Sequence, residues 1–178
     1  MGRGPGTGGL GPVVLAAGVL GTASAVAAKW LLLGRVRQGE HPLWSGFVWR
    51  NELTAVYYEE LVVRWLGTAM IGTPLFNAVL RAFGARIGRG VSCETRWLPE
   101  PDLVSLGDGT VINRGCVIQT HLFQDRILRL GPVRFEAGTT LGPHSITLFD
   151  TRLGAGSSVG ANSLVMRGET LPRRAASR

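Results

Sequence analysis

The chain has 178 residues, of which only 17% are charged, and this length allows one domain with an appendage. The mean hydropathy of +0.18 is high for a water-soluble protein, so we test the sequence for a membrane-associated segment. The formal net charge is +7, but the basic residues are scattered arginines without a nucleic-acid-binding motif, so we expect no nucleic acid partner.

The first predicted element is a transmembrane helix over residues 10–33, preceded by a disordered segment over residues 1–9. The stretch from Leu10 to Ala28 contains no charged residue. It reaches the length of about 20 residues that a bilayer core requires if Lys29 extends its ammonium group to the lipid interface. Trp30 then lies at the level of the lipid headgroups.

Charges around this apolar run predict its orientation. Arg35 and Arg37 follow it, whereas only Arg3 precedes it. Positive-inside logic therefore places the C-terminal side in the cytoplasm, at the inner (plasma) membrane. The alternative is a secretory signal peptide, with Arg3 as its charged start and an Ala-Ser-Ala or Ala-Val-Ala cleavage site.

Residues 34–84 are predicted to form membrane-associated amphipathic helices after a turn at Pro42. From Glu52 to Trp65, apolar residues recur at helical spacing. Thr73 can cap a second helix that has Pro74 at its first position and ends at Gly84. We expect both helices to lie on the membrane surface, and the alternative is ordinary core helices. The second helix has an apolar side made of Leu75, Phe76, Val79, Leu80 and Phe83.

Residues 85–172 contain a six-residue repeat, followed by a tail over residues 173–178. The repeat predicts short strands in which large side chains point inward, and three such strands close one coil of about 18 residues. The phase shifts within residues 93–104, and again between Ile118 and Phe135, which indicates an excursion around residues 124–132. The repeated positions are Phe135, Leu141, Thr147, Leu153, Val159, Val165 and Leu171, with Ile87, Leu106, Ile112 and Ile118 upstream.

Two kinds of resemblance accompany the repeat. Residues 77–91 look like the short helix that leads into the β-helix of hexapeptide-repeat acyltransferases. Residues 39–53, 96–130, 140–146 and 163–172 resemble the C-terminal region of single-module nonribosomal peptide synthetases of the epsilon-poly-lysine synthetase type. The fold implied is mainly β: a left-handed parallel β-helix preceded by one transmembrane helix and short amphipathic helices.

The resemblance also implies partners and a donor. In that family, adenylation and carrier domains precede a membrane region interleaved with three acetyltransferase-like domains. The expected partners are therefore the membrane, adenylation and carrier domains, and neighbouring β-helix domains, in a trimer or pseudo-trimer. No cofactor is expected to be bound covalently, and the expected acyl donor is a thioester on a phosphopantetheine carrier or acyl-coenzyme A.

Acyl transfer to an amine needs a base, and histidine is the usual base near neutral pH. His121 lies at a predicted turn beside the excursion. Asp125 could orient its imidazole, and Arg126 could hold a phosphate or carboxylate. The alternative for His121 is a turn histidine bonded to a neighbouring coil.

His144 occupies the same repeat position as His121 and is a second candidate base, with a structural role as the alternative. Asn113 and Arg114 fall at an exposed turn and are candidate substrate-binding residues, although asparagine is also common in turns. His41 is expected to be structural or interfacial, and no metal site is expected. A zinc site would require the three histidines to converge.

Two functions remain open from the sequence. The first is an acyltransferase-type module that joins amino-acid units through amide bonds, or a stand-alone acyltransferase that uses acyl-coenzyme A. The second is a non-catalytic scaffold or interaction module. Cys93 and Cys116 lack metal-ligand spacing and are expected to be buried thiols.

Overall fold

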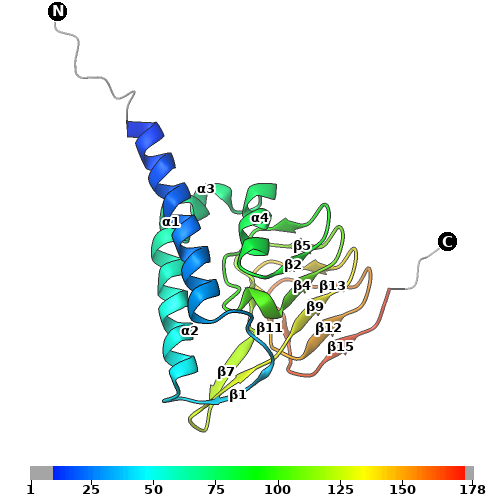
Figure 1. Ribbon diagram of the computed structural model, residues 1–178. Coiled ribbons are helices and arrows are strands. Elements are labelled where there is room, and N and C mark those ends of the chain that lie inside the picture. The colour runs from blue at the N-terminus through cyan, green and yellow to red at the C-terminus, as the bar shows by residue number, and fades with distance from the viewer. Residues whose placement is uncertain (1–9, 175–178) are drawn as a thin grey trace, which may run out of the picture.

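The computed structural model describes residues 10–174 and places a layer of helices beside a parallel β-helix (Figure 1). The disorder predicted for residues 1–9 and the last four residues of the predicted tail lie outside the described residues. The chain runs from the helical layer into the β-helix, whose last strand lies farthest from the helices (Figure 1).

The β-helix has three faces made of short parallel strands. One face has the order β15-β12-β9-β4-β2, the second β13-β10-β5-β3 and the third β14-β11-β6. The strands are β2 (Arg86–Ile87), β3 (Ser92–Cys93), β4 (Val104–Leu106), β5 (Val111–Ile112), β6 (Val117–Ile118), β9 (Val133–Phe135), β10 (Thr140–Leu141), β11 (Ile146–Thr147), β12 (Thr151–Leu153), β13 (Ser158–Val159), β14 (Leu164–Val165) and β15 (Thr170–Leu171).

The six-residue repeat is confirmed by the strand register. Ile112 pairs with Leu141, which pairs with Val159 on the next coil, and all three are buried. Because strands stack in register, each repeated position forms a column of side chains in a shared interior. Burying each large apolar side chain stabilises the fold by about 1.5–3 kcal/mol.

The two expected shifts of phase are also present. The first contains the short 3₁₀-helix η3 (Pro101–Leu103). The second is a hairpin of β7 (His121–Gln124) and β8 (Ile127–Leu130), so the excursion begins earlier than predicted. Strand β1 (Gly39–Pro42) pairs antiparallel with β8 and completes a three-stranded sheet. The predicted turn follows this strand directly, because the chain turns at Leu43 and Trp44 and the Ser45 amide donates to the Pro42 carbonyl at 2.9 Å.

The helical layer consists of α1 (Leu10–Leu32), α2 (Gly46–Tyr57), η2 (Tyr58–Gly67), α3 (Thr68–Met70) and α4 (Pro74–Ala82). Helix α1 packs along α2 and η2, of which η2 is wound as a π-helix (Figure 1). Helix α2 begins before the predicted Glu52, because the Ser45 hydroxyl accepts a hydrogen bond from the Val48 amide at 3.4 Å and caps it.

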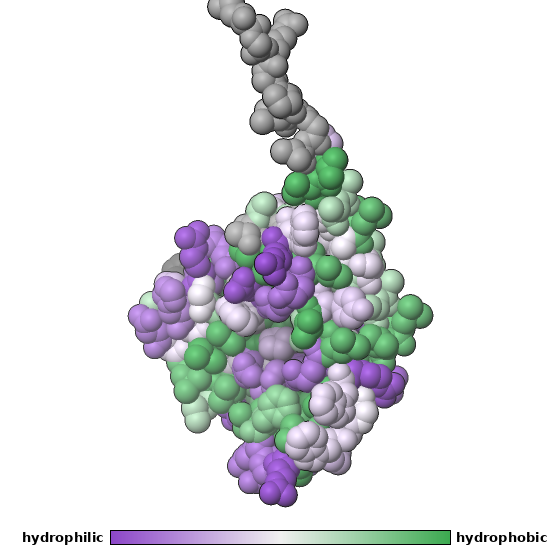
Figure 2. Space-filling model, turned by 90° about the vertical axis from the view of Figure 1, so that its left-hand side faces the viewer, coloured by the Kyte–Doolittle hydropathy of each residue, from purple (hydrophilic) through white to green (hydrophobic). Residues whose placement is uncertain are grey.

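Within residues 10–174, α1 is the one helix that is long and apolar enough to cross a membrane. Many large apolar side chains of the helical layer are exposed, including Val13, Leu20, Leu31, Leu53 and Val56. Figure 2, which looks onto this layer, shows hydrophobic areas interrupted by hydrophilic side chains.

Helix α4 closes the first coil of the β-helix. Thr73 caps it and Pro74 occupies its first turn, as predicted. Phe76 and Leu80 are fully buried and belong to the same apolar cluster as Ile87. This side of α4 therefore packs as a core helix, which was the alternative to a membrane-surface helix.

The prediction that Lys29 extends to the lipid interface is wrong. Its side chain is 3% exposed, and its Nζ lies 2.7 Å from Oδ2 of Asp102 in η3. Trp30 donates from Nε1 to the carbonyl of Ala82 at 2.8 Å, which ties the last turn of α1 to α4. Gly84 has φ +110°, and a Cβ there would collide with the Asp102 carboxylate. Asp102, which is 73 positions farther along the chain, thus pairs with the Lys29 ammonium group that the local sequence alone would place at the lipid interface.

Candidate functional site

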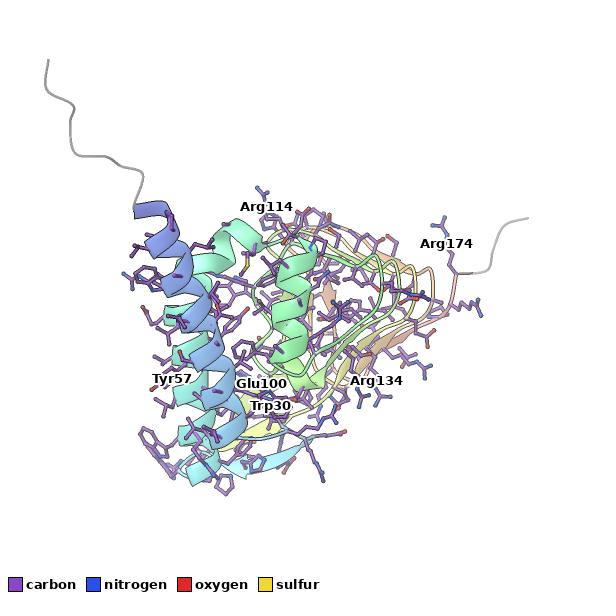
Figure 3. All side chains as sticks on the ribbon, turned by 45° about the horizontal axis from the view of Figure 1, so that its top comes forward. Trp30, Tyr57, Glu100, Arg114, Arg134 and Arg174 are labelled. Carbon is purple, nitrogen blue, oxygen red and sulfur yellow. The ribbon has the colours of Figure 1, made fainter. Side chains whose placement is uncertain are left out.

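His121 stands where the chain leaves the β-helix to form the β7–β8 hairpin. Its Nδ1 lies 2.9 Å from each carboxylate oxygen of Glu100. Glu100 comes from the segment just before η3, and Figure 3 places it between the helices and the β-helix. The pair therefore joins two insertions into the six-residue repeat.

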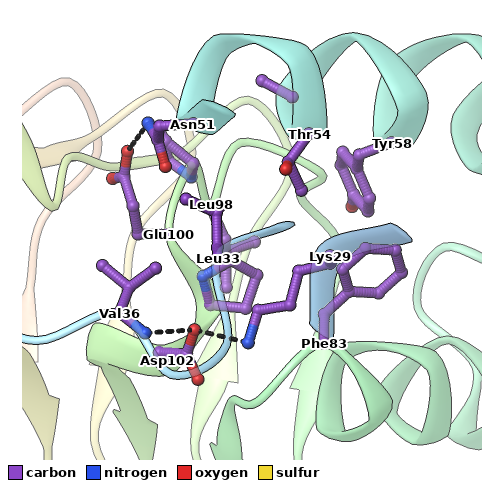
Figure 4. A pocket seen from close by; sticks show the side chains of 13 residues that line it. Lys29, Leu33, Val36, Asn51, Thr54, Tyr58, Phe83, Leu98, Glu100 and Asp102 are labelled. Atoms are coloured by element: carbon purple, nitrogen blue, oxygen red, sulfur yellow. Dashed lines mark hydrogen bonds and ion pairs between the residues drawn. The ribbon is translucent and has the colours of Figure 1, made fainter. Parts of the chain in front are cut away.

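Besides His121, two neighbouring side chains donate hydrogen bonds to the Glu100 carboxylate, which is 1% exposed. The Thr120 hydroxyl donates to Oε2 at 2.6 Å, and Asn51 of α2 donates from Nδ2 to Oε1 at 3.0 Å (Figure 4). The Glu100 amide donates to the Thr120 hydroxyl at 3.3 Å. Because an ionised carboxylate only accepts hydrogen bonds, this contact favours the neutral tautomer of His121 that carries its proton on Nδ1 and leaves Nε2 as the basic nitrogen.

The pKa of His121 reflects two opposed effects. Burial lowers it, but the hydrogen bond and negative charge of Glu100, with a contribution from Glu52, raise the pKa of His121 above its ordinary value of 6.5. The imidazole is thereby a stronger base than a free histidine, while 17% of its side chain stays exposed.

A groove of about 250 Å³ lies next to this pair. It borders His121 through Phe123, whose ring meets the imidazole edge-on with centroids 5.3 Å apart. Glu52 adds a carboxylate to an otherwise apolar wall. The remaining lining residues are Leu43, Trp44, Val48 and Trp49.

The structure corrects the predicted roles of Asp125 and Arg126. Both lie in the two-residue turn of the hairpin, with φ values of +52° and +61°, and both are exposed. His121 is at the other end of the hairpin, paired with Leu130. The residue that orients the imidazole is thus Glu100 rather than Asp125, and Arg126 does not meet His121.

His144 does not share the site of His121. It lies at the corner between β10 and β11, where its amide donates to the carbonyl of Arg114 at 3.1 Å. Its ring covers Gly115, whose φ of +74° and missing Cβ leave room for it. Asn113 donates to the carbonyl of Leu141 at 2.7 Å, as a turn asparagine does. Figure 3 shows Arg114 far from Glu100, so this corner and the His121 corner are separate.

The three histidines do not converge on a metal site. His41 belongs to β1 and stacks on Phe47 with centroids 3.9 Å apart, as expected of a structural histidine. In residues 10–174 no group of three or more His, Cys, Asp or Glu side chains is placed to hold a metal ion. Cys93 and Cys116 are buried free thiols, and burial raises the pKa of Cys93 to about 11.

Sequence reasoning missed Glu100 and Asn51. Glu100 stands between two prolines within a segment that breaks the six-residue repeat, at residues 97–101. A carboxylate flanked by Pro99 and Pro101 was the available signal, and it is weak because the insertion over residues 93–104 also contains Glu94 and Asp102. Asn51 gave none, because its contact with Glu100 depends on how α2 packs on the β-helix.

No family model matches the chain. The chain is 35% identical over 148 residues to the delta-poly-L-ornithine synthetase of Acinetobacter baumannii, a match that covers 83% of this chain and 11% of that protein. It is also similar to a hexapeptide-repeat-containing acetyltransferase from Vibrio cholerae, with 14% identity, coverage of 88% of this chain and 84% of that chain, and a TM-score of 0.41.

The class of the molecule is a hexapeptide-repeat β-helix with an N-terminal apolar helix. The resemblance to synthetases predicted from the sequence is confirmed, because the chain is similar to one segment of a poly-amino-acid synthetase. The chain spans about a tenth of the length of that relative.

Proposed function

We propose that this chain is a membrane-anchored acyltransferase-type module that forms an amide bond, with His121 as the general base. The observation that carries the proposal is the hydrogen-bonded pair of His121 and buried Glu100 beside an open groove. A base held in one tautomer by a buried acceptor is suited to remove a proton during acyl transfer.

The proposed reaction needs only two reactants, an amine and an acyl thioester. The nitrogen of a neutral amine attacks the carbonyl carbon of an acyl thioester, and Nε2 of His121 takes a proton from that nitrogen. The carbon–sulfur bond then breaks, and the imidazolium returns the proton to the leaving thiolate. Glu100 stabilises the imidazolium between these two events.

The proposed donor is an acyl thioester on a phosphopantetheine carrier or on coenzyme A. The relative's name, a poly-L-ornithine synthetase, supports a reaction that joins amino-acid units. The proposed partners are adenylation and carrier domains and neighbouring β-helix domains, in a trimer or pseudo-trimer. Helix α1 supports a site at the inner (plasma) membrane, and Arg35 and Arg37 at its C-terminal side support a cytoplasmic β-helix.

The test measures single-turnover amide formation by the membrane assembly that carries this chain. His121→Ala is expected to lower the rate by about 10²–10⁴-fold, the usual contribution of a general base. His144→Ala is the matched control and is expected to leave the rate within about twofold, because its corner is separate. Unchanged product formation in His121→Ala would leave only the scaffold function.

Glu100 is a positioning residue, and its role is tested by the pH dependence of the rate of amide formation. A base acts in its neutral form, so the rate should rise with pH through the raised pKa of His121. Glu100→Gln removes the charge that raises this pKa, so the inflection should move to lower pH. A profile that does not move would remove Glu100 from the mechanism.

A further inference from the structure

A polar cleft of about 350 Å³ lies beyond the C-terminal end of α1, beside the face of the β-helix that contains β2, β4 and β9. Its basic side chains come from two separate parts of the chain, the segment after α1 and the outer surface of the β-helix. The cleft is lined by Arg35, Arg37, Arg86 and Arg134, together with Gln38, Ser105 and several apolar residues.

Strand register aligns part of this cleft. Arg86 on β2 pairs with Ser105 on β4, and Ser105 pairs with Arg134 on β9. All three residues therefore share one column on the outside of the face. With strands about 4.8 Å apart, the two arginines start about 10 Å apart with the serine hydroxyl between them.

The four cleft arginines have no acidic partner among the residues that the structure describes. Within residues 10–174 none of them forms an ion pair, although Arg64, Arg89, Arg129, Arg152 and Arg167 each pair with a carboxylate. Asp102 also lines the cleft, but its side chain is fully buried and already pairs with Lys29 at 2.7 Å. Its Oδ2 also accepts a hydrogen bond from the Val36 amide at 3.2 Å.

Four converging positive charges repel one another, and an anion between them would relieve this repulsion. Guanidinium groups bind phosphate oxygens in pairs of parallel hydrogen bonds. Positive-inside logic explains Arg35 and Arg37, but it does not explain why Arg86 and Arg134 of the β-helix meet them at the same cleft.

We propose that this arginine cleft binds the phosphate of the acyl-thioester donor, either the phosphopantetheine arm of a carrier or coenzyme A. The inference rests on the proposed function. The short segment from Glu100 to Asp102 links the two sites. Glu100 bonds to His121 at one site. Asp102, two residues later, lines the cleft. The donor's phosphate and its thioester thus bind on two sides of one short segment.

The position of the cleft favours a ligand from water over a lipid headgroup. The exposed apolar side chains gather on the helical layer, and Tyr57 marks its outer side in Figure 3. Arg134 lies on the β-helix, away from that side (Figure 3). Next to it in the same column stands Arg152, an exposed residue paired with Glu136.

The test measures binding of coenzyme A to the full chain in neutral detergent micelles by calorimetry. Arg86→Gln and Arg134→Gln are each expected to weaken binding about tenfold, as loss of one charge-assisted phosphate contact does. Arg89→Gln is the matched control, because Arg89 is 95% exposed and lies outside the cleft. Pantetheine, which has no phosphate, should bind more weakly than coenzyme A and with equal affinity to all variants.

The two sources of phosphate are distinguished by 4′-phosphopantetheine, which carries the single phosphate of a carrier arm. Affinity equal to that of coenzyme A supports a carrier arm, and much lower affinity supports coenzyme A itself. Coenzyme A binding that is undetectable, or equal in wild type and both cleft variants, would overturn the proposal. So would loss of binding to phosphatidylglycerol vesicles in the cleft variants with unchanged affinity for coenzyme A, because the cleft would then hold a lipid headgroup.

Two results distinguish failure of the proposed function from failure of the cleft assignment. If His121→Ala forms product normally while the cleft variants still lose affinity for coenzyme A, the phosphate site stands without the assigned base. If His121→Ala loses activity and the cleft variants bind coenzyme A normally, the base stands and the cleft assignment is wrong.

Discussion

His121 and His144 occupy the same position of the six-residue repeat, but their corners of the β-helix differ. At the His144 corner the chain turns directly into the next strand, and the imidazole lies exposed over Gly115. At the His121 corner the chain extends into a hairpin, and a second insertion brings the Glu100 carboxylate within 2.9 Å of Nδ1 of the ring. Interruptions of the repeat, rather than the repeat itself, thus create a buried and polarised site.

The largest expected effect concerns the support beneath the His121 corner. Lys29→Met leaves the buried Asp102 carboxylate without its partner, which should lower the free energy of unfolding by about 3–5 kcal/mol. Urea denaturation in micelles measures this change. The matched control is Arg89→Met, because the Arg89–Asp108 pair is exposed and 3.8 Å long, and it should cost less than about 1 kcal/mol. Equal losses in both variants would contradict the buried pair.

A smaller effect is expected from the hydroxyl that holds Glu100. Thr120→Val keeps the shape of the side chain but removes its 2.6 Å hydrogen bond to the carboxylate, which should cost about 1–3 kcal/mol. Thr140→Val, in the strand before the His144 corner, should change the free energy of unfolding by less than about 0.5 kcal/mol. If Thr120→Val proves equally neutral, Glu100 does not depend on that hydroxyl.

The smallest effect is expected at the hairpin turn. Asp125 and Arg126 both adopt positive φ, which Asn-Gly adopts at lower cost. The double substitution Asp125→Asn with Arg126→Gly should raise the free energy of unfolding by up to about 1 kcal/mol and leave the rate of amide formation within about twofold. A large loss of rate would return Asp125 or Arg126 to the site.

The sequence predicted the β-helix well because each repeated position is determined locally. A large residue at every sixth place, with short strands between turns, leads to inward columns such as Ile112, Leu141 and Val159. The cap at Thr73 was predictable for the same reason, since a cap depends on adjacent residues.

The site could not be predicted in the same way, because its partners are distant in sequence. Glu100 is 21 positions from His121, and Asn51 is 49 positions from Glu100. Asp125, four positions from His121, was the nearer carboxylate, but the hairpin carries it away from the imidazole. Lys29 was misplaced for the same reason, because its partner Asp102 lies in the β-helix.

The proposed role of His121 as a base depends most on the buried Glu100 carboxylate, which determines the protonation of the imidazole. Nitrogen-15 NMR of the imidazole, followed against pH in wild type and Glu100→Gln, tests this directly. We expect the wild-type ring to carry its proton on Nδ1 and to titrate above pH 6.5, and the variant to titrate at lower pH, since burial alone lowers this pKa. A proton on Nε2, or the same titration in both proteins, would contradict it.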